Sequence, residues 1–403
     1  MSTARSGGNR VPHSTEAHSA EKGAGAHSVN PPGPLASLVR DRDTVICCGS
    51  GGVGKTTVAA ALALAGATAG RRTCVVTIDP ARRLADALGI GDLGNKPRQI
   101  DGPWPGELWA MMLDTKGTFD DLIRTYSSNP EQVESIFSNR LYKNMSGSLS
   151  GTQEYMAMEK LYELHMDDRF DLVIVDTPPT RNALDFLDAP RQLGRFLDNK
   201  IFRLLMMPAR TYLRAVSVAT RTFLRTVSRV VGGEVVADTV AFFQAFEGLE
   251  EGFRDRASKV ESVLSDPSTA FVLMTAPRAE AAEEAMFFAA KLRASRIGVE
   301  ALVVNRVHPR FDPPPSVAGE LNALNTPPGS APSSLGSPSD SAPSSLAALV
   351  ENWVDMNRVA EQEQAHLVAL REKIAPAPVV EVPLMGSDVH DIEGIWAVAS
   401  FLA

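Results

Sequence analysis

Residues 49–57 of the chain have the sequence Gly49-Ser50-Gly51-Gly52-Val53-Gly54-Lys55-Thr56-Thr57. The stretch fits the pattern G-x-x-x-x-G-K-[ST], with Gly49 and Gly54 as the spaced glycines. The glycines let the backbone curl until several N–H groups point at one anion, and the next helix begins with its positive end on that anion. Lys55 adds a point charge to the β- and γ-phosphates, and Thr56 offers a hydroxyl to Mg²⁺. The stretch therefore predicts a binding site for ATP or GTP.

The segments on both sides of this loop predict a strand, a loop and a helix in that order. Residues 44–48 are a short apolar run typical of a strand, and residues 58–65 are rich in helix formers. Further buried strands are predicted at residues 73–78, 108–113, 170–175, 270–275, 301–305 and 379–383. Strands that alternate with helices predict an α/β fold with a doubly wound, mostly parallel sheet, whose ligands bind at the carboxyl ends of the strands.

The composition divides the 403 residues into a core and three other segments. Residues 1–34 are polar, Gly-rich and free of periodicity, which predicts a disordered tail. Residues 35–185 and 266–403 are predicted to form the P-loop core, and residues 186–265 a helical subdomain inserted into it. Within the second part of the core, residues 311–346 are rich in Pro, Ser and Gly and predict a flexible insertion.

The bulk composition argues against several classes of protein. The net charge of −8 and the pI near 5.5 argue against nucleic acid as an obligate partner. The three cysteines are too few for a disulfide framework and indicate a reducing compartment. We find no apolar run of about 18 residues that would span a membrane, and the N-terminal stretch lacks the apolar core of a signal peptide. We therefore expect a cytoplasmic location, either free or peripheral at the membrane.

Two aspartates follow predicted buried strands downstream of the loop. Asp176 ends the strand at 170–175 and is expected to hold Mg²⁺ through water, opposite Thr56. Asp79 ends the strand at 73–78, where an aspartate in ATPases of this shape orients the water that attacks the γ-phosphate. The structural alternatives are a strand-end cap for Asp176 and the N-cap of a helix beginning at Ala81 for Asp79.

The form Gly-x-Gly-Gly-Val-Gly-Lys-Thr-Thr is similar to the deviant P-loop of the nucleotide-dimerised ATPases. Within that class, residues 79–86 resemble the first switch of the arsenite-pump ATPase family, which includes the ATPases that deliver tail-anchored membrane proteins. Residues 176–180 resemble its second switch, and residues 151–157 resemble a helix start. Residues 303–305 resemble its adenine-reading strand end and residues 382–384 its adenine loop, which implies that Asn305 and Pro383 contact the nucleotide. The resemblance runs from about residue 40 to the C-terminus, apart from residues 311–346.

The resemblance implies an ATPase with ATP and Mg²⁺ as cofactors, and with Lys55 and Asp79 as catalytic residues. It further implies a dimer that closes on ATP and two switch loops that move the helical subdomain. That subdomain would engage a client helix or a membrane protein. Regulatory nucleotide binding without hydrolysis, surface positioning of the partition type and a small-metabolite ligase or kinase are the alternatives.

Ser50 is a departure from the family, which has a lysine there that reaches the partner's phosphates. Loss of such a cation can slow phosphoryl transfer by roughly 10³–10⁵-fold. The first switch has Arg82 in place of His, and the second continues Arg181-Asn182-Ala183 in place of Gly-His-Thr, so Arg82 or Arg181 could supply charge in cis. The pattern fits a heterodimer with a lysine-bearing related ATPase and equally fits a slow homodimer.

All three cysteines, Cys47, Cys48 and Cys74, lie on predicted core strands. Buried cysteine usually behaves as a small hydrophobe. We therefore expect no arsenite site, no zinc and no iron–sulfur cluster.

The helical insert carries arginines at steps of seven and four, namely Arg203, Arg210, Arg214, Arg221, Arg225 and Arg229. A second amphipathic stretch follows, with apolar residues from Val236 to Phe253. The plain interpretation is two surface helices with solvated polar faces. The functional interpretations are an apolar groove for a client helix and an arginine face for acidic lipid or an acidic partner.

Overall fold

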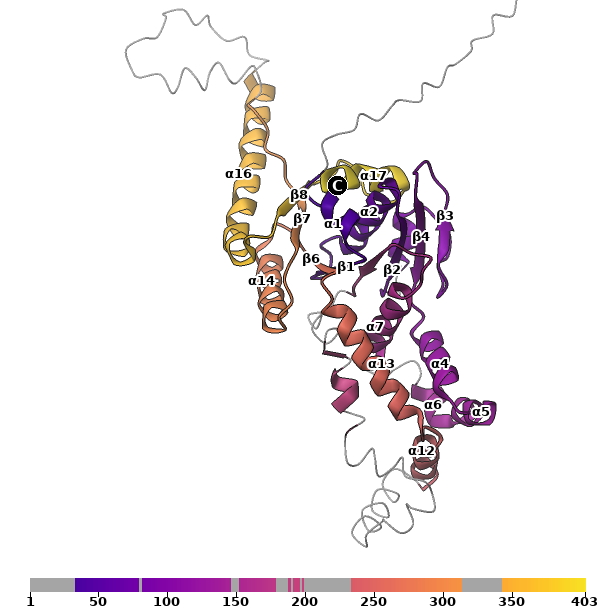
Figure 1. Ribbon diagram of the computed structural model, residues 1–403. Helices are drawn as coiled ribbons and strands as arrows, with labels where there is room; N and C mark the ends of the chain where they lie inside the picture. The colour runs from indigo at the N-terminus through magenta and orange to yellow at the C-terminus, as the bar shows by residue number, and fades with distance from the viewer. Residues whose placement is uncertain are drawn as a thin grey trace, which may run out of the picture. The chain divides into compact units, whose positions relative to one another are not determined.

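Among the described residues, eight strands form one sheet in the order β3-β4-β2-β5-β1-β6-β7-β8 (Figure 1). The computed structural model describes residues 33–79, 82–145, 152–178, 188–189, 191–195, 198, 233–313 and 343–403. The strands are β1 (Thr44–Gly49), β2 (Arg72–Thr77), β3 (Arg98–Ile100), β4 (Glu107–Met112), β5 (Leu172–Asp176), β6 (Thr269–Thr275), β7 (Ala301–Val307) and β8 (Val379–Pro383). Every pair is parallel except β3 with β4. The predicted α/β class with a mostly parallel sheet is confirmed.

The strand β3 is the one described strand that the sequence does not predict. It has only three residues, of which Ile100 alone is buried. A segment this short carries no detectable period of alternation, and it pairs at the edge of the sheet with β4.

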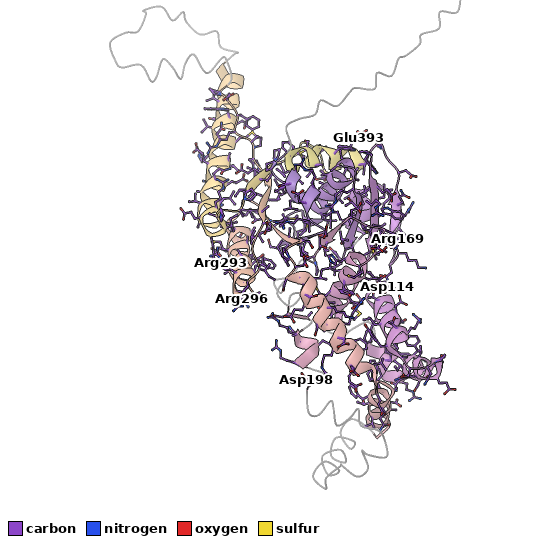
Figure 2. All side chains as sticks on the ribbon, viewed as in Figure 1. Asp114, Arg169, Asp198, Arg293, Arg296 and Glu393 are labelled. Carbon is purple, nitrogen blue, oxygen red and sulfur yellow. The ribbon has the colours of Figure 1, made fainter. Side chains whose placement is uncertain are left out.

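Helices cover both faces of the sheet. The first face carries α1 (Ala36–Asp41), α2 (Lys55–Thr68), α3 (Arg83–Ala87) and α17 (Ile392–Leu402). The second carries α7 (Thr152–His165), α13 (Leu249–Leu264), α14 (Ala279–Ala294) and α16 (Pro343–Ile374). The strand β1 serves both layers, because Val45 and Cys47 pack on the first face while Ile46 and Cys48 pack on the second. Charged side chains such as Arg293 and Glu393 lie on the outside (Figure 2).

A separate helical layer lies beyond the carboxyl ends of β2, β4 and β5. It consists of α4 (Thr115–Tyr126), α5 (Pro130–Ser138), α6 (Arg140–Met145) and α12 (Gly233–Ala245), packed with α7 and α13. Its core is aromatic, including Phe119, Tyr142, Phe242, Phe246 and Phe253. The predicted insert 186–265 contributes α12 and α13, and α4 to α6 come from the chain before β5. The arginine-bearing stretch at residues 203–229 lies outside the described residues.

The predicted flexible segment 311–346 differs from the structure at both ends. Phe311 is held by its main chain, which accepts hydrogen bonds from Trp353 Nε1 at 2.8 Å and Asn357 Nδ2 at 3.1 Å. Helix α16 already begins at Pro343. Residues 314–342 and the predicted tail up to residue 32 lie outside the described residues.

None of the helices in the described part of the chain combines the length and the apolar composition that crossing a membrane requires.

Candidate nucleotide-binding site

The P-loop connects the end of β1 to the start of α2 and depends on glycine at two close approaches. Gly54 precedes α2 with φ of 87°, and a Cβ atom there would lie 2.1 Å from Asn305 Nδ2. A Cβ atom on Gly49 would lie 2.2 Å from the Met274 carbonyl oxygen. Both positions therefore exclude side chains on steric grounds, and the loop keeps its curled backbone.

Lys55 lies inside this curl, with only 6% of its surface exposed. Its Nζ atom donates a hydrogen bond to the Ser50 carbonyl oxygen at 2.8 Å. Burial lowers the pKa of Lys55 from its ordinary value, and the nearby Asp176 carboxylate opposes that shift. The loop thus holds a cation where the motif expects phosphate.

Asp176 at the end of β5 is the buried carboxylate of the site. Its Oδ2 atom accepts hydrogen bonds from the Thr56 hydroxyl at 2.7 Å and the Thr77 hydroxyl at 2.8 Å. Its Oδ1 atom is buried and has no hydrogen-bond partner among the described residues. Burial raises the pKa of this carboxyl group from its ordinary value of 3.8 to about 6.

These residues fit a hydrated Mg²⁺ ion. A buried carboxylate oxygen without a partner costs free energy unless a water or a cation satisfies it, and Asp176 Oδ1 is such an atom. Thr56, next to it, supplies the hydroxyl. Magnesium usually keeps several waters and takes only one or two protein ligands beside substrate phosphates. A magnesium site therefore does not require a larger cluster of ligands. Among the described residues, no group of three or more His, Cys, Asp or Glu side chains is placed to hold a metal ion.

Asp79 lies beside this pair and is linked to it through Thr77. Its backbone N–H donates to the Thr77 hydroxyl oxygen at 3.2 Å, and the same hydroxyl donates to Asp176. Arg83 Nε lies 3.8 Å from Asp79 Oδ2. Helix α3 begins at Arg83 with Arg82 at the N-cap position, so Asp79 does not occupy the N-cap position considered above.

A cavity of about 280 Å³ opens onto these residues. Its walls come from the P-loop, from the first switch and the start of α3, from the ends of β5 and β7, and from the loop between β8 and α17. The lining residues are Gly52, Gly54, Lys55, Thr56, Thr57, Asp79, Arg83, Asp86, Ala87, Thr177, Arg306 and Val389. The fold therefore brings together most of the motif with Asp79. Val53 is buried beneath the loop, and Gly51 is exposed.

The predicted adenine contacts take different positions. Asn305 is buried beneath the P-loop, where Nδ2 donates to the Val53 carbonyl oxygen at 3.0 Å. Pro383 lines another cavity, of about 570 Å³, together with Val307 and His308. Asn305 thus braces the loop in this structure, and its contact with adenine stays a prediction, as does that of Pro383.

Arg83 and Arg306 line the P-loop cavity, and the sequence interpretation did not select either of them. Arg306 sits at a bulge in the pairing of β7 with β8 and has φ of 62°. A bulge redirects a side chain that would otherwise alternate with its neighbours. The Arg306 guanidinium has no hydrogen-bond or ion-pair partner in the described part of the chain. A non-glycine residue in this conformation is uncommon and is often found at functional sites.

Arg82, one of the two arginines that could supply charge in cis, lies away from the P-loop cavity in this structure. The Arg82 guanidinium pairs with Asp92 at 2.8 Å, and both side chains are 71% exposed. Arg82 lines a different cavity, with Leu93 and Met112. Arg181 and the end of the second switch lie outside the described residues.

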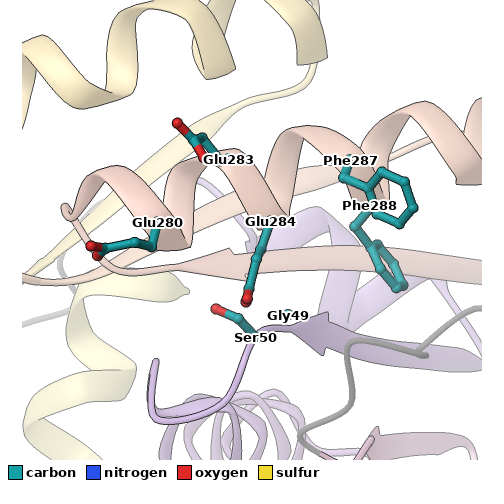
Figure 3. Close-up of a pocket in the computed structure, with 7 residues that line it drawn as sticks. All are labelled: Gly49, Ser50, Glu280, Glu283, Glu284, Phe287 and Phe288. Atoms are coloured by element: carbon teal, nitrogen blue, oxygen red, sulfur yellow. The ribbon is translucent and has the colours of Figure 1, made fainter.

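Ser50 faces away from the P-loop cavity, toward α14. A second cavity, of about 420 Å³, is lined by Gly49, Ser50, Glu280, Glu283, Glu284, Phe287 and Phe288. Figure 3 shows the Glu284 carboxylate directed at the Ser50 side chain. Carboxylates and a hydroxyl therefore occupy the surroundings of position 50, where the sequence resemblance implies a lysine.

The three cysteines lie in the sheet, as predicted. Burial raises the pKa of the Cys48 thiol to about 12 and raises those of Cys47 and Cys74 as well. Neutral buried thiols are poor metal ligands and poor nucleophiles.

Comparison with known proteins assigns the chain to a family. Residues 42–314 match the family of anion-transporting ATPases. The chain belongs to this family. It is 31% identical over 271 residues to an uncharacterized protein of Streptomyces coelicolor, covering 67% of this chain and 64% of the relative.

Two relatives with ATPase names agree with the family. The chain is 28% identical to ATPase get3 of Aspergillus terreus, over 40% of this chain and 48% of the relative. It is 26% identical to ATPase GET3B of Arabidopsis thaliana, over 65% of this chain and 63% of the relative. The chain thus covers less than two thirds of the length of these relatives. The predicted resemblance to the arsenite-pump and tail-anchor-targeting ATPases is confirmed at the level of the family.

Proposed function

We propose that the chain binds ATP with Mg²⁺ and hydrolyses the bond between its β- and γ-phosphates. The observation that carries the proposal is the group formed by Thr56, Thr77 and Asp176 beside the buried Lys55, with Asp79 joined to it through Thr77. Membership in the anion-transporting ATPase family supports it.

The residues have separate tasks in this reaction. The P-loop N–H groups and Lys55 bind the phosphates, while Thr56 would hold a magnesium ion directly and Asp176 would hold it through water. When bound, magnesium neutralises charge that develops on the phosphate oxygens. Asp79 orients a water molecule, whose oxygen forms a bond to the γ-phosphorus. The bond from that phosphorus to the bridging oxygen breaks, its electron pair stays on ADP, and the proton of the water passes to the released phosphate.

We also propose that the chain works as a dimer and that its helical layer engages a client helix or a membrane partner. Support comes from the connection between the site and that layer through α7. Gln153 Nε2, in the first turn of α7, donates to the Ile78 carbonyl oxygen at 3.3 Å, next to Asp79. The family and the ATPase names of the relatives agree with such a mechanism.

Steady-state hydrolysis of ATP by the purified chain tests the reaction. The controls are Lys55→Ala, which removes the phosphate cation, and Asp79→Asn, which removes the carboxylate that orients water. We expect magnesium-dependent phosphate release that both substitutions abolish, with nucleotide binding retained in Asp79→Asn. Turnover that survives both substitutions would come from a contaminant and would refute the assignment.

A regulatory nucleotide-binding subunit is the second candidate, and Ser50 is the observation that favours it. The glutamates Glu280, Glu283 and Glu284, which line one cavity with Ser50, would complement a cation from a partner chain. This candidate predicts ATP binding without turnover by the isolated chain, and turnover when a lysine-bearing related ATPase is added.

A further inference from the structure

The two consecutive arginines at the start of α3, Arg82 and Arg83, have side chains in different surroundings. Arg82 is paired with Asp92 at the surface, and its side chain is outside the P-loop cavity. Arg83 lines the P-loop cavity and lies 3.8 Å from Asp79 Oδ2. The chain therefore provides one arginine at the site and a chemically identical neighbour away from it.

The position of Arg83 in the cavity indicates which end of the nucleotide it faces. The metal-site group is built from the ends of β2 and β5 and from Thr56, and Asp79 directly follows the same end of β2. Arg306 comes from β7, which lies on the other side of β1 in the sheet. Magnesium held by Thr56 and Asp176 would bring the γ-phosphate to this side of the cavity, and Asp79 and Arg83 line the cavity there.

The electrostatics of this wall create a need for a cation. Two acidic residues lie there: the Thr77 hydroxyl donates to the Asp176 carboxylate and accepts from the backbone N–H of Asp79, and phosphoryl transfer adds charge that must be stabilised. Lys55 is the cation of the P-loop and donates here to the Ser50 carbonyl oxygen, and position 50 itself carries no charge. Arg83 is the remaining described cation on that wall of the cavity.

We propose that the Arg83 guanidinium stabilises the γ-phosphoryl group during its transfer, within the same chain. This inference rests on the hydrolysis proposed above. Guanidinium is a planar fork of five donors, so it can bind a carboxylate and a phosphoryl oxygen at the same time. The Arg83 side chain is 60% exposed, while that of Asp79 is 13% exposed. The arginine can therefore turn toward a phosphate while the aspartate stays in place. The charge that a lysine at position 50 would bring from a partner comes here from α3.

The test compares Arg83→Gln, Arg83→Lys and the matched control Arg82→Gln in the full chain. Three quantities are measured: the dissociation constant of MgATP, the single-turnover rate constant of hydrolysis, and the trapping of MgADP with aluminium fluoride, which mimics the transferring phosphoryl group. We expect Arg83→Gln to lower the rate constant by about 10²–10³-fold and to abolish trapping, with the affinity for MgATP changed by only a few fold. Arg83→Lys should retain part of both, and Arg82→Gln should match the wild type.

The outcomes separate the inference from the function on which it rests. A wild-type chain that binds MgATP without hydrolysing it would refute the proposed hydrolysis and the role of Arg83 together. A wild-type chain that hydrolyses ATP while Arg83→Gln keeps its rate and its trapping would overturn only the inference. The same holds if Arg82→Gln loses as much activity as Arg83→Gln, or if Arg83→Gln changes the affinity alone. Should Arg83→Gln fail to fold, Arg83→Lys decides: a partial loss of rate and trapping supports the inference, and wild-type rate and trapping contradict it.

Discussion

The clearest energetic prediction concerns Asp176 in the nucleotide-free chain. Burial raises the pKa of its carboxyl group from 3.8 to about 6, so the folded state holds the proton more tightly than the unfolded state. Well below the ordinary pKa of 3.8, both states are protonated, and this carboxyl group costs folding nothing. The penalty grows as the unfolded state ionises and is complete above the folded-state pKa. A difference of about two pKa units corresponds to roughly 3 kcal/mol of lost stability at neutral pH.

Asp176→Asn removes this titration while keeping an oxygen that can accept the Thr56 and Thr77 hydrogen bonds. Between pH 5 and pH 7.5 the wild-type chain should lose on the order of 1 kcal/mol of unfolding free energy relative to the variant. The measurement is urea denaturation of both proteins, without nucleotide or metal, at the two pH values. Comparing the variant with the wild type at each pH cancels the constant cost of exchanging an oxygen for an amide nitrogen.

Asp171→Asn is the matched control, because the pKa of Asp171 is shifted in the opposite direction to that of Asp176. Hydrogen bonds from the Arg72 side chain lower the pKa of Asp171, so its carboxylate is ionised in both states from pH 5 to pH 7.5. Its variant should therefore differ from the wild type by a constant amount over that interval. Addition of Mg²⁺ and ATP should stabilise the wild type and not Asp176→Asn. If the stability difference between Asp176→Asn and the wild type is the same at both pH values, the buried carboxylate is not the unsatisfied charge described here.

Two further predictions concern the rim of the cavity and the contact of α7 with α13. Arg306→Gln should weaken MgATP binding by about tenfold, the value of roughly one charge-assisted hydrogen bond, with the hydrolysis rate at saturating ATP unchanged. The control Arg310→Gln, in the neighbouring exposed loop, should bind MgATP as the wild type does. Equal affinities of the wild type and both variants would contradict a contact between Arg306 and the nucleotide. Glu159→Gln should lower the free energy of unfolding by about 3 kcal/mol, because it leaves the partly buried Arg256 guanidinium without its anion. The double variant Glu159→Leu with Arg256→Met, measured by the same denaturation, should lose less stability. If the stability losses of the two single substitutions simply add in the double variant, the two residues are not coupled.

The sheet was largely predictable from the sequence, because parallel strands buried on both faces are continuous apolar runs. The run at 170–175 and the strand Leu172–Asp176 coincide within two residues. The strand β3 was not predictable, since three edge residues carry no period. The division of helices between the core and the helical layer could not be predicted from the sequence either, because α4 to α6 join α12 and α13 through contacts between residues far apart in the chain.

The site divides in the same way between local motif and long-range geometry. The loop of residues 49–57 and the strand-end aspartates are local patterns, and the sequence predicts their positions. The choice between Arg82 and Arg83 depends on where α3 begins and on the presence of Asp92 beside Arg82. Arg306 reaches the cavity only because β7 bulges against β8. The local sequence motif shows neither the position of Arg83 nor that of Arg306, because both positions depend on contacts made by the folded chain.

The contacts that α7 makes in its first turn and near its middle differ in strength, and this difference bears on how the site could act on the helical layer. In its first turn, Gln153 makes a hydrogen bond of 3.3 Å to the Ile78 carbonyl oxygen, a long neutral contact. One and a half turns later, the buried Glu159 pairs with Arg256 of α13, whose guanidinium lies 3.8 Å above the Tyr162 ring. Breaking a buried ion pair costs far more than breaking one neutral hydrogen bond. A shift of Ile78 and Asp79 on nucleotide binding should therefore change the contact at Gln153 first, and α7 should move together with α13.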